Sequence, residues 1–218
     1  ASGLAIADKL RTQATSINQG ISNGNSAVAL LQIADKSMAE QSNILDTIKS
    51  KLIQANTDTT STDGRTAIAK DINKLLEQLD NIAKQTNYNG TSLLQKDRAT
   101  AAGQAGLSFQ VGENKADLIS TKTVQSNVKG LGLTTLSTKA KSGAAVAAGA
   151  TAGTTGVFTK AFASAAQTAV DTAITKLNGY RGDIGSTQNQ VESAVRNLMT
   201  QATNVKAAES IIRDVDYA

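Results

Sequence analysis

The stretch that decides the fold is residues 10–52, which read LRTQATSINQGISNGNSAVALLQIADKSMAEQSNILDTIKSKL. Apolar side chains recur in it every seven residues, with Gly24 in one position of the series: Leu10, Ile17, Leu31, Met38, Leu45 and Leu52. A stripe with this spacing, sustained along the whole stretch, is typical of a helix that packs lengthwise against partner helices. The pattern therefore predicts one long helix over about residues 1–56.

Two later stretches carry the same periodicity. The polar run NTDTTSTDG at residues 56–64 predicts a reversal of the chain. A second helix is expected over residues 63–87, with Ile72 and Leu79 in its apolar seam. A third is expected over residues 161–218, with a seam made of Leu177, Ile184, Val191, Leu198, Val205 and Ile212. Three long heptad-patterned helices predict a mainly α fold in the form of an elongated rod.

A segment between the second and third helices has the period of a strand. Leu107, Phe109 and Val111 alternate with polar residues, and a turn at residues 112–115 allows residues 116–124 to return as a second strand. We expect a small β-hairpin region that caps the helices. The organisation predicted is a first half of a rod domain at residues 1–135, an Ala-, Gly- and Thr-rich variable insertion at 136–160, either loop or partly helical, and the last helix of the same rod domain at 161–218.

Three glycines fall inside the third predicted helix, at Gly179, Gly182 and Gly185. A glycine in a helix interior is less favourable than alanine by about 1 kcal/mol, so each position needs a reason. Close backbone approach to a neighbouring helix is the favoured interpretation. A local kink or break is the alternative.

The composition excludes most enzyme classes. The chain has no Cys, His, Pro or Trp, so neither disulfides, nor thiolate or imidazole catalysis, nor the usual zinc and iron sites are available. We expect no catalytic, cofactor-binding or metal-binding residues. The net charge of +4 is spread singly along the chain, which disfavours nucleic-acid binding. Without a continuous apolar run of membrane-spanning length, a membrane partner is not expected either.

Two parts of the sequence resemble the conserved ends of bacterial flagellin, the protein of the flagellar filament. The first is ASGLAIADKLR at residues 1–11, followed by ISNGNSAVALLQIA at residues 21–34. The second is RGDIGSTQNQ at residues 181–190, with the closing DVDYA at residues 214–218. Between them, QTNYNG at residues 85–90 resembles the turn that ends the second helix of the family. The resemblance covers most of the chain, in the right order.

The resemblance implies a non-catalytic structural subunit of the flagellum, secreted by type III export and serving motility from an extracellular filament. Its implied partners are other flagellin subunits, an export chaperone and the filament cap. Residues 21–41 are similar to flagellins of the epsilonproteobacterial type. The outer polymerisation helices of the family are not found in this sequence, so the resemblance implies a rod-domain fragment.

Many flagellins are detected by an innate immune receptor of the Toll-like class, through a patch on the first two rod helices. Alignment to that patch places Thr47 where the family has an Arg and Lys51 where it has a Leu, and it keeps the acidic residue at Asp71. Loss of a guanidinium and of an apolar contact removes two anchors of the kind that dominate interfaces. We therefore predict that the receptor recognises this protein weakly or not at all.

Two alternatives remain open at this point. One is a hook–filament junction protein, which shares the terminal helices of flagellin. The other is a secreted flagellin-like protein with an immunomodulatory or adhesive role that builds no filament. Loss of motility and of filaments on gene deletion would separate these functions.

Overall fold

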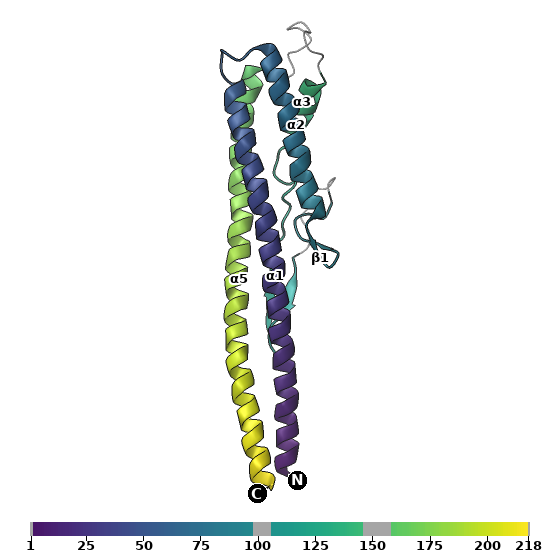
Figure 1. Cartoon of the computed structure of the whole chain (residues 1–218), viewed down its shortest axis with the longest axis vertical. Coiled ribbons are helices and arrows are strands. Elements are labelled where there is room, and N and C mark those ends of the chain that lie inside the picture. Colours follow the sequence, from purple (N-terminus) through teal and green to yellow (C-terminus); the bar gives the residue numbers. More distant parts are fainter. Residues whose placement is uncertain (1, 98–105, 146–157, 218) are drawn as a thin grey trace. The chain divides into compact units, whose positions relative to one another are not determined.

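The computed structural model describes residues 2–97, 106–145 and 158–217 of the 218-residue chain. Within these residues the elements follow one another as α1 (Ser2–Ala55), α2 (Thr62–Gln85), β1 (Asn87–Tyr88), β2 (Thr91–Ser92), β3 (Ser108–Gln110), β4 (Leu118–Ser120), α3 (Thr134–Ala144) and α5 (Lys160–Tyr217) (Figure 1). The predicted fold class, mainly α with a small antiparallel strand region, is confirmed.

The chain forms two compact units. Unit 1 comprises residues 1–32, 106–122 and 183–218, and unit 2 comprises residues 33–105 and 123–182. Both α1 and α5 contribute to both units, so each unit joins segments that are distant in sequence. The division predicted from the sequence, with a rod domain at residues 1–135 and 161–218, stays a prediction. Residues 146–157 of the predicted insertion at 136–160 lie outside the described residues, but its first part belongs to α3.

The reversal between α1 and α2 is fixed by polar side chains at both helix ends. Ser61 caps α2, because its hydroxyl accepts a hydrogen bond from the Gly64 N–H over 3.0 Å. Arg65 closes the other side: its Nε donates to the carbonyl of Ala55 over 2.9 Å and its Nη2 to that of Thr57 over 3.0 Å. The first bond satisfies the Ala55 carbonyl at the end of α1, and the second adds to the bond that the Thr57 carbonyl accepts from the Thr60 N–H over 3.0 Å.

Unit 2 has a core of aliphatic side chains from α1, α2 and α5. Its fully buried members include Met38, Leu45, Ile48, Leu52, Ile72, Leu76, Leu79 and Leu177. Helix α3 packs against α2 where Gly143 is small enough to fit: a Cβ there would lie 3.0 Å from the Cβ atoms of Ala69 and Phe158. The heptad stripes read from the sequence therefore face inward in this unit.

Unit 1 is built on α1, α5 and the hairpin of β3 and β4. The two strands are antiparallel, with Phe109 opposite Ile119. Val111, which directly follows β3, joins Ile17 of α1 and Leu198 of α5 in one buried cluster. The expectation that the hairpin caps the helices is wrong, because the hairpin packs on the sides of α1 and α5. Its apolar side chains need an apolar surface, and that surface lies along the flanks of the helices and not at their ends.

The helical glycines differ from expectation. A Cβ at Gly24 would lie only 2.3 Å from Cγ2 of Val195, so this glycine allows α1 and α5 to come close. At Gly179, Gly182 and Gly185, a Cβ would meet no described atom within 4 Å beyond the adjacent helix backbone. Helix α5 also runs unbroken from Lys160 to Tyr217. For the described chain, the interpretation by close approach and the idea of a break are therefore wrong, whereas a local kink stays a prediction.

Candidate interaction surfaces

The seam residues proposed from the sequence lie mostly inside the units. Those that the structure buries are Ile17, Leu31, Met38, Leu45, Leu52, Ile72, Leu79, Leu177, Ile184, Val191 and Leu198. Leu10, Val205 and Ile212 are half-buried. The buried seam side chains cannot reach another protein, so contacts with partners must come from the half-buried seam residues or from residues outside the seam.

Several large apolar side chains are exposed, and the seam pattern did not single them out. In unit 1 they are Leu4, Ile6, Leu118, Met199, Ile211 and Val215, and in unit 2 Ile33 and Ile53. Ile211 and Val215 are 64% and 70% exposed, and their spacing of four residues puts them on one face of α5. Exposed apolar side chains that share a face are typical of protein contact surfaces.

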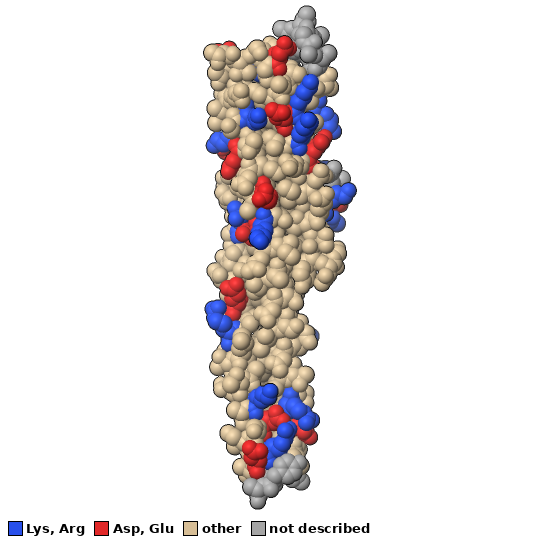
Figure 2. Space-filling view, viewed as in Figure 1, with Lys and Arg blue, Asp and Glu red and all other residues tan. Residues whose placement is uncertain are grey.

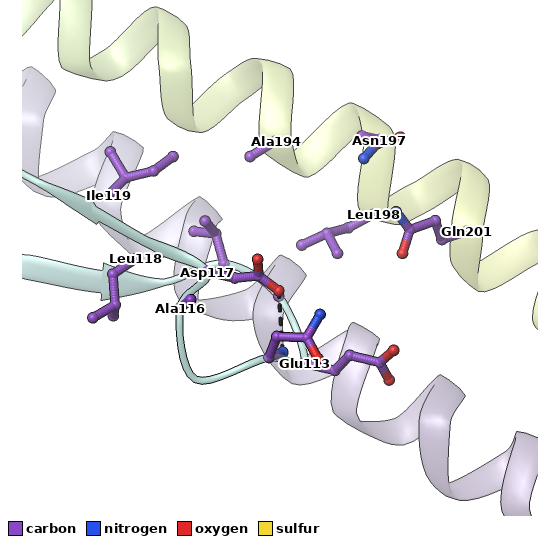
Figure 3. A pocket seen from close by; sticks show the side chains of 12 residues that line it. Glu113, Ala116, Asp117, Leu118, Ile119, Ala194, Asn197, Leu198 and Gln201 are labelled. Atoms are coloured by element: carbon purple, nitrogen blue, oxygen red, sulfur yellow. Dashed lines mark hydrogen bonds between the residues drawn. The ribbon is translucent and has the colours of Figure 1, made fainter.

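A groove of about 440 Å³ lies in unit 1 between the β3–β4 turn and α5 (Figure 3). Leu198 and Ala194 of α5 form its apolar side. Glu113 and Asp117 on the turn make its rim acidic. The Asp117 carboxylate accepts a hydrogen bond from the Asn114 N–H over 3.0 Å, which fixes the shape of the turn. The groove is therefore suited to a polar or basic side chain with an apolar stem.

The three receptor-patch positions all lie in unit 2, but only two of them touch. Thr47 is exposed on α1, and its hydroxyl donates to the Asn43 carbonyl one turn earlier over 3.0 Å. Lys51 Nζ lies 3.2 Å from Oδ2 of Asp71, so these residues form an ion pair between α1 and α2. The heptad pattern did not reveal this pair, because it does not give the register between the helices.

One buried polar residue was also missed by the sequence reasoning. Gln41 is 0% exposed, and its Nε2 donates to the carbonyl of Leu79 over 3.1 Å and to that of Ser126 over 2.6 Å. It thereby ties α1 to α2 and to the segment before α3. A signal existed, since Gln41 stands between Ala34 and Ile48 in an otherwise apolar heptad row. A polar residue in such a row is a known way to set register.

Charged side chains of opposite sign lie beside one another on the surface shown in Figure 2. Two ion pairs join α1 and α5 in unit 2, Lys49 with Asp171 at 2.6 Å and Arg181 with Asp35 at 2.9 Å. The hydrogen bond to Asp35 raises the pKa of Arg181. Exposed ion pairs of this kind add little to the stability of the fold. Their main effect is to favour one register between neighbouring helices.

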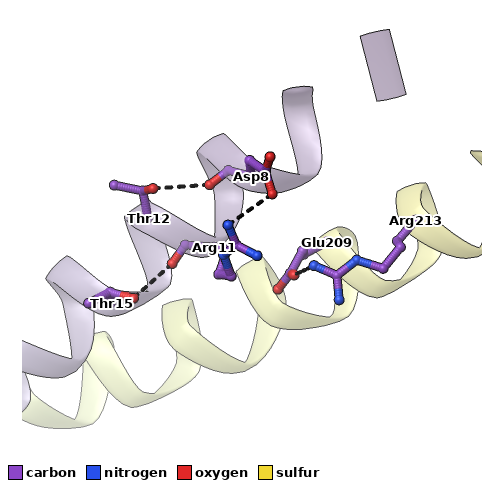
Figure 4. Close-up of polar contacts among 6 residues, drawn as sticks. All are labelled: Asp8, Arg11, Thr12, Thr15, Glu209 and Arg213. Carbon is purple, nitrogen blue, oxygen red and sulfur yellow. Dashed lines mark hydrogen bonds and ion pairs between the residues drawn. The ribbon is translucent and has the colours of Figure 1, made fainter. Parts of the chain in front are cut away.

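A further charge cluster belongs to unit 1, where Asp8 and Arg11 of α1 pair at 3.0 Å (Figure 4). On α5, Arg213 pairs with Glu209, which is 8% exposed. Burial of a carboxylate is tolerated when a cation pairs with it, and Arg213 supplies that cation to Glu209.

Neither metal nor membrane chemistry emerges from the described part of the chain. No group of three or more His, Cys, Asp or Glu side chains is arranged there to hold a metal ion. None of the described helices combines the length and apolar character that crossing a membrane requires.

Comparison with known proteins gives a consistent family. The sequence matches the model of the bacterial flagellin N-terminal helical region over residues 1–99 and that of the C-terminal helical region over residues 167–218. Flagellin B of Helicobacter pylori is 38% identical over 149 residues, which are 68% of this chain but 28% of the relative. This similarity is consistent with the epsilonproteobacterial type.

Two Bacillus proteins extend the comparison over more of the chain. Flagellin of Bacillus subtilis is 34% identical over 233 aligned positions, covering 100% of this chain and 75% of the relative. The crystal structure of Bacillus cereus flagellin has a TM-score of 0.62 at 26% identity, covering 86% of this chain and 94% of that one. Bacterial flagellins are structural proteins and not enzymes. Since both family regions match, and a relative is matched over most of its length, this chain belongs to the bacterial flagellin family.

Proposed function

We propose that the chain is a non-catalytic, structural part of a flagellar filament, in which copies of the protein polymerise outside the cell and serve motility. The observation that carries the proposal is the match to both flagellin regions. Contact between the two matched regions supports it, because Gly24 from the first packs against Val195 from the second. The chain aligns to only 28% of the length of the Helicobacter pylori relative, so assembly of the whole protein is inferred from the family.

The packing suits a subunit whose helices are already held together before it meets another copy. Most seam side chains are buried inside the units. Exposed apolar residues such as Met199 and Ile211 remain for contacts between copies. Copies that meet through two different surfaces form an open helical polymer when the rotation between them does not close into a ring. The function therefore requires surface complementarity and no chemistry.

Secretion by type III export, an export chaperone and the filament cap are part of the same proposal. The chain contains no Cys, so no disulfide needs to be broken before an unfolded chain enters an export channel. A pull-down of the chaperone with the unfolded protein would test this part separately from filament assembly.

Deletion of the gene followed by electron microscopy and a motility assay tests the main proposal. Loss of filaments and of swimming, both restored by the intact gene, is the expected result. Hooks that remain while flagellin accumulates in the medium would instead assign a hook–filament junction protein. Normal filaments and normal swimming would overturn the proposal and favour a secreted immunomodulatory or adhesive relative.

We also propose that the flagellin-sensing Toll-like receptor recognises this protein weakly. Thr47 offers no guanidinium, and Lys51 replaces an apolar contact with a cation that pairs with Asp71. An anchor acid that is already paired within the chain is less available to a partner, because the partner must first displace Lys51.

Receptor-reporter cells treated with the purified full-length protein test this second proposal. The double variant Thr47→Arg/Lys51→Leu should gain potency over the unaltered protein. As a matched control, Thr15→Arg/Lys36→Leu makes the same two replacements at exposed positions of α1 outside the patch, and it should not gain potency. Full potency of the unaltered protein, or equal gains for both double variants, contradicts the proposal.

A further inference from the structure

The two-residue turn between β1 and β2 consists of Asn89 and Gly90. Tyr88 pairs with Thr91 across the turn, and both turn residues have positive φ, 51° at Asn89 and 82° at Gly90. This is the backbone of a tight hairpin turn, for which an Asn-Gly pair is the preferred sequence. Both side-chain positions are exposed to solvent. We propose that Asn89 is a site of spontaneous deamidation, independent of the function proposed above.

The reaction needs only the chain and water. The backbone nitrogen of Gly90 attacks Cγ of Asn89, so that an N–Cγ bond forms while the Cγ–Nδ2 bond breaks. Ammonia leaves and carries away the proton lost by the Gly90 nitrogen, and the product is a five-membered succinimide. Water then opens the ring in one of two ways. Cleavage of the new N–Cγ bond gives aspartate, and cleavage of the original backbone C–N bond gives isoaspartate. Glycine favours the attack because it has no Cβ to hinder the approach.

The turn holds the attacking nitrogen only loosely. The Gly90 N–H donates to Oδ1 of Asn87 over 3.2 Å, and this bond must open before Gly90 can attack. The hairpin comprises only two residue pairs, and a hairpin of this kind is marginally stable by itself. A Cβ at Gly90 would meet nothing within 4 Å, so no described neighbour blocks rearrangement of the turn.

The chain contains two other Asn-Gly pairs, and both lie within helices. In α1, the Asn23 Nδ2 donates to the Gln110 carbonyl over 2.9 Å, and Gly24 is buried against Val195. In α5, Asn178 and Gly179 are both exposed, so Asn178 differs from Asn89 mainly in its helical backbone. A helix fixes ψ and engages the glycine N–H with a carbonyl four residues earlier, so the nitrogen cannot reach Cγ.

Timed incubation of the folded full-length protein at neutral and mildly alkaline pH tests the proposal. Peptide mapping by mass spectrometry follows the three asparagines, and labelling by an isoaspartate methyltransferase identifies the isomer. Asn89 should convert on the order of tenfold faster than Asn178 or Asn23, equivalent to about 1.4 kcal/mol of barrier. In urea-unfolded protein the three rates should converge. No conversion at Asn89, or equal rates at Asn89 and Asn178 in the folded protein, overturns the proposal.

Discussion

Replacing Gly24 by alanine should destabilise unit 1, whereas the same replacement at Gly182 should stabilise the chain. At Gly24 the added Cβ would lie 2.3 Å from Cγ2 of Val195 and 3.7 Å from Cγ1 of Val191. Val195 is β-branched and has few rotamers in a helix, so α1 and α5 must separate or Val195 must become strained. Overpacking of about 1–3 kcal/mol, set against about 1 kcal/mol of helix propensity gained, leaves a net loss of up to about 2 kcal/mol.

At Gly182 only the gain in helix propensity is expected, without overpacking. The position is helical and exposed, and a Cβ there would meet no described atom within 4 Å beyond its own helix backbone. Alanine should therefore raise the free energy of unfolding by about 1 kcal/mol, partly because it restricts the unfolded chain. Gly179→Ala serves as a matched second case, since its surroundings are equally open.

Urea unfolding followed by far-ultraviolet circular dichroism gives the free energies, and thermal unfolding gives an independent ranking. For a chain of this size, 1 kcal/mol corresponds to a shift in Tm of about 2–4 °C. The order expected is Gly182→Ala above wild type and wild type above Gly24→Ala. A Gly24→Ala protein that gains as much stability as Gly182→Ala would refute the close packing of α1 on α5 at this position. A loss of stability in Gly182→Ala would refute the open surroundings.

Three further variants probe the polar contacts, each by urea unfolding unless stated. Arg65→Met should cost about 1–2 kcal/mol, because the Ala55 and Thr57 carbonyls lose a charged donor; an unchanged midpoint would show that water replaces it fully. Gln41→Met keeps the side-chain volume but leaves the Leu79 and Ser126 carbonyls without this donor. It should therefore cost about 1–3 kcal/mol of stability and speed amide hydrogen exchange around Ser126. Unchanged exchange there would argue that Gln41 does not hold this segment to α1. Lys51→Leu should change stability by less than about 1 kcal/mol, because the pair with Asp71 is exposed; a larger loss would contradict that.

The sequence pattern was sufficient to locate the long helices. Heptad spacing is a local property, and the series through Met38 and Leu45 predicted α1 while the polar run before Ser61 predicted its end. The alternation around Phe109 likewise predicted β3. These predictions succeeded because each depends only on residues a few positions apart.

The interactions between elements were harder to predict. Gly24 stands in the seam series and Gly182 does not, so the pattern did contain the information on which glycine faces another helix. The pairing of Lys51 with Asp71 depends on the register between α1 and α2, which periodicity leaves undetermined. The flank on which the hairpin packs depends on contacts such as that of Ile17 with Val111, which are far apart in sequence.

The composition of unit 1 from three separate segments has a consequence for the order of folding. Its buried cluster joins Ile17, Val111 and Leu198, which lie near the beginning, middle and end of the chain. Contacts at such separations form late, because long stretches of chain must be closed before they contribute. A ribosome-bound chain that has not yet reached Leu198 lacks one of the three members of this cluster. We therefore expect the first part of α1 to stay loosely structured until Leu198 has been synthesised.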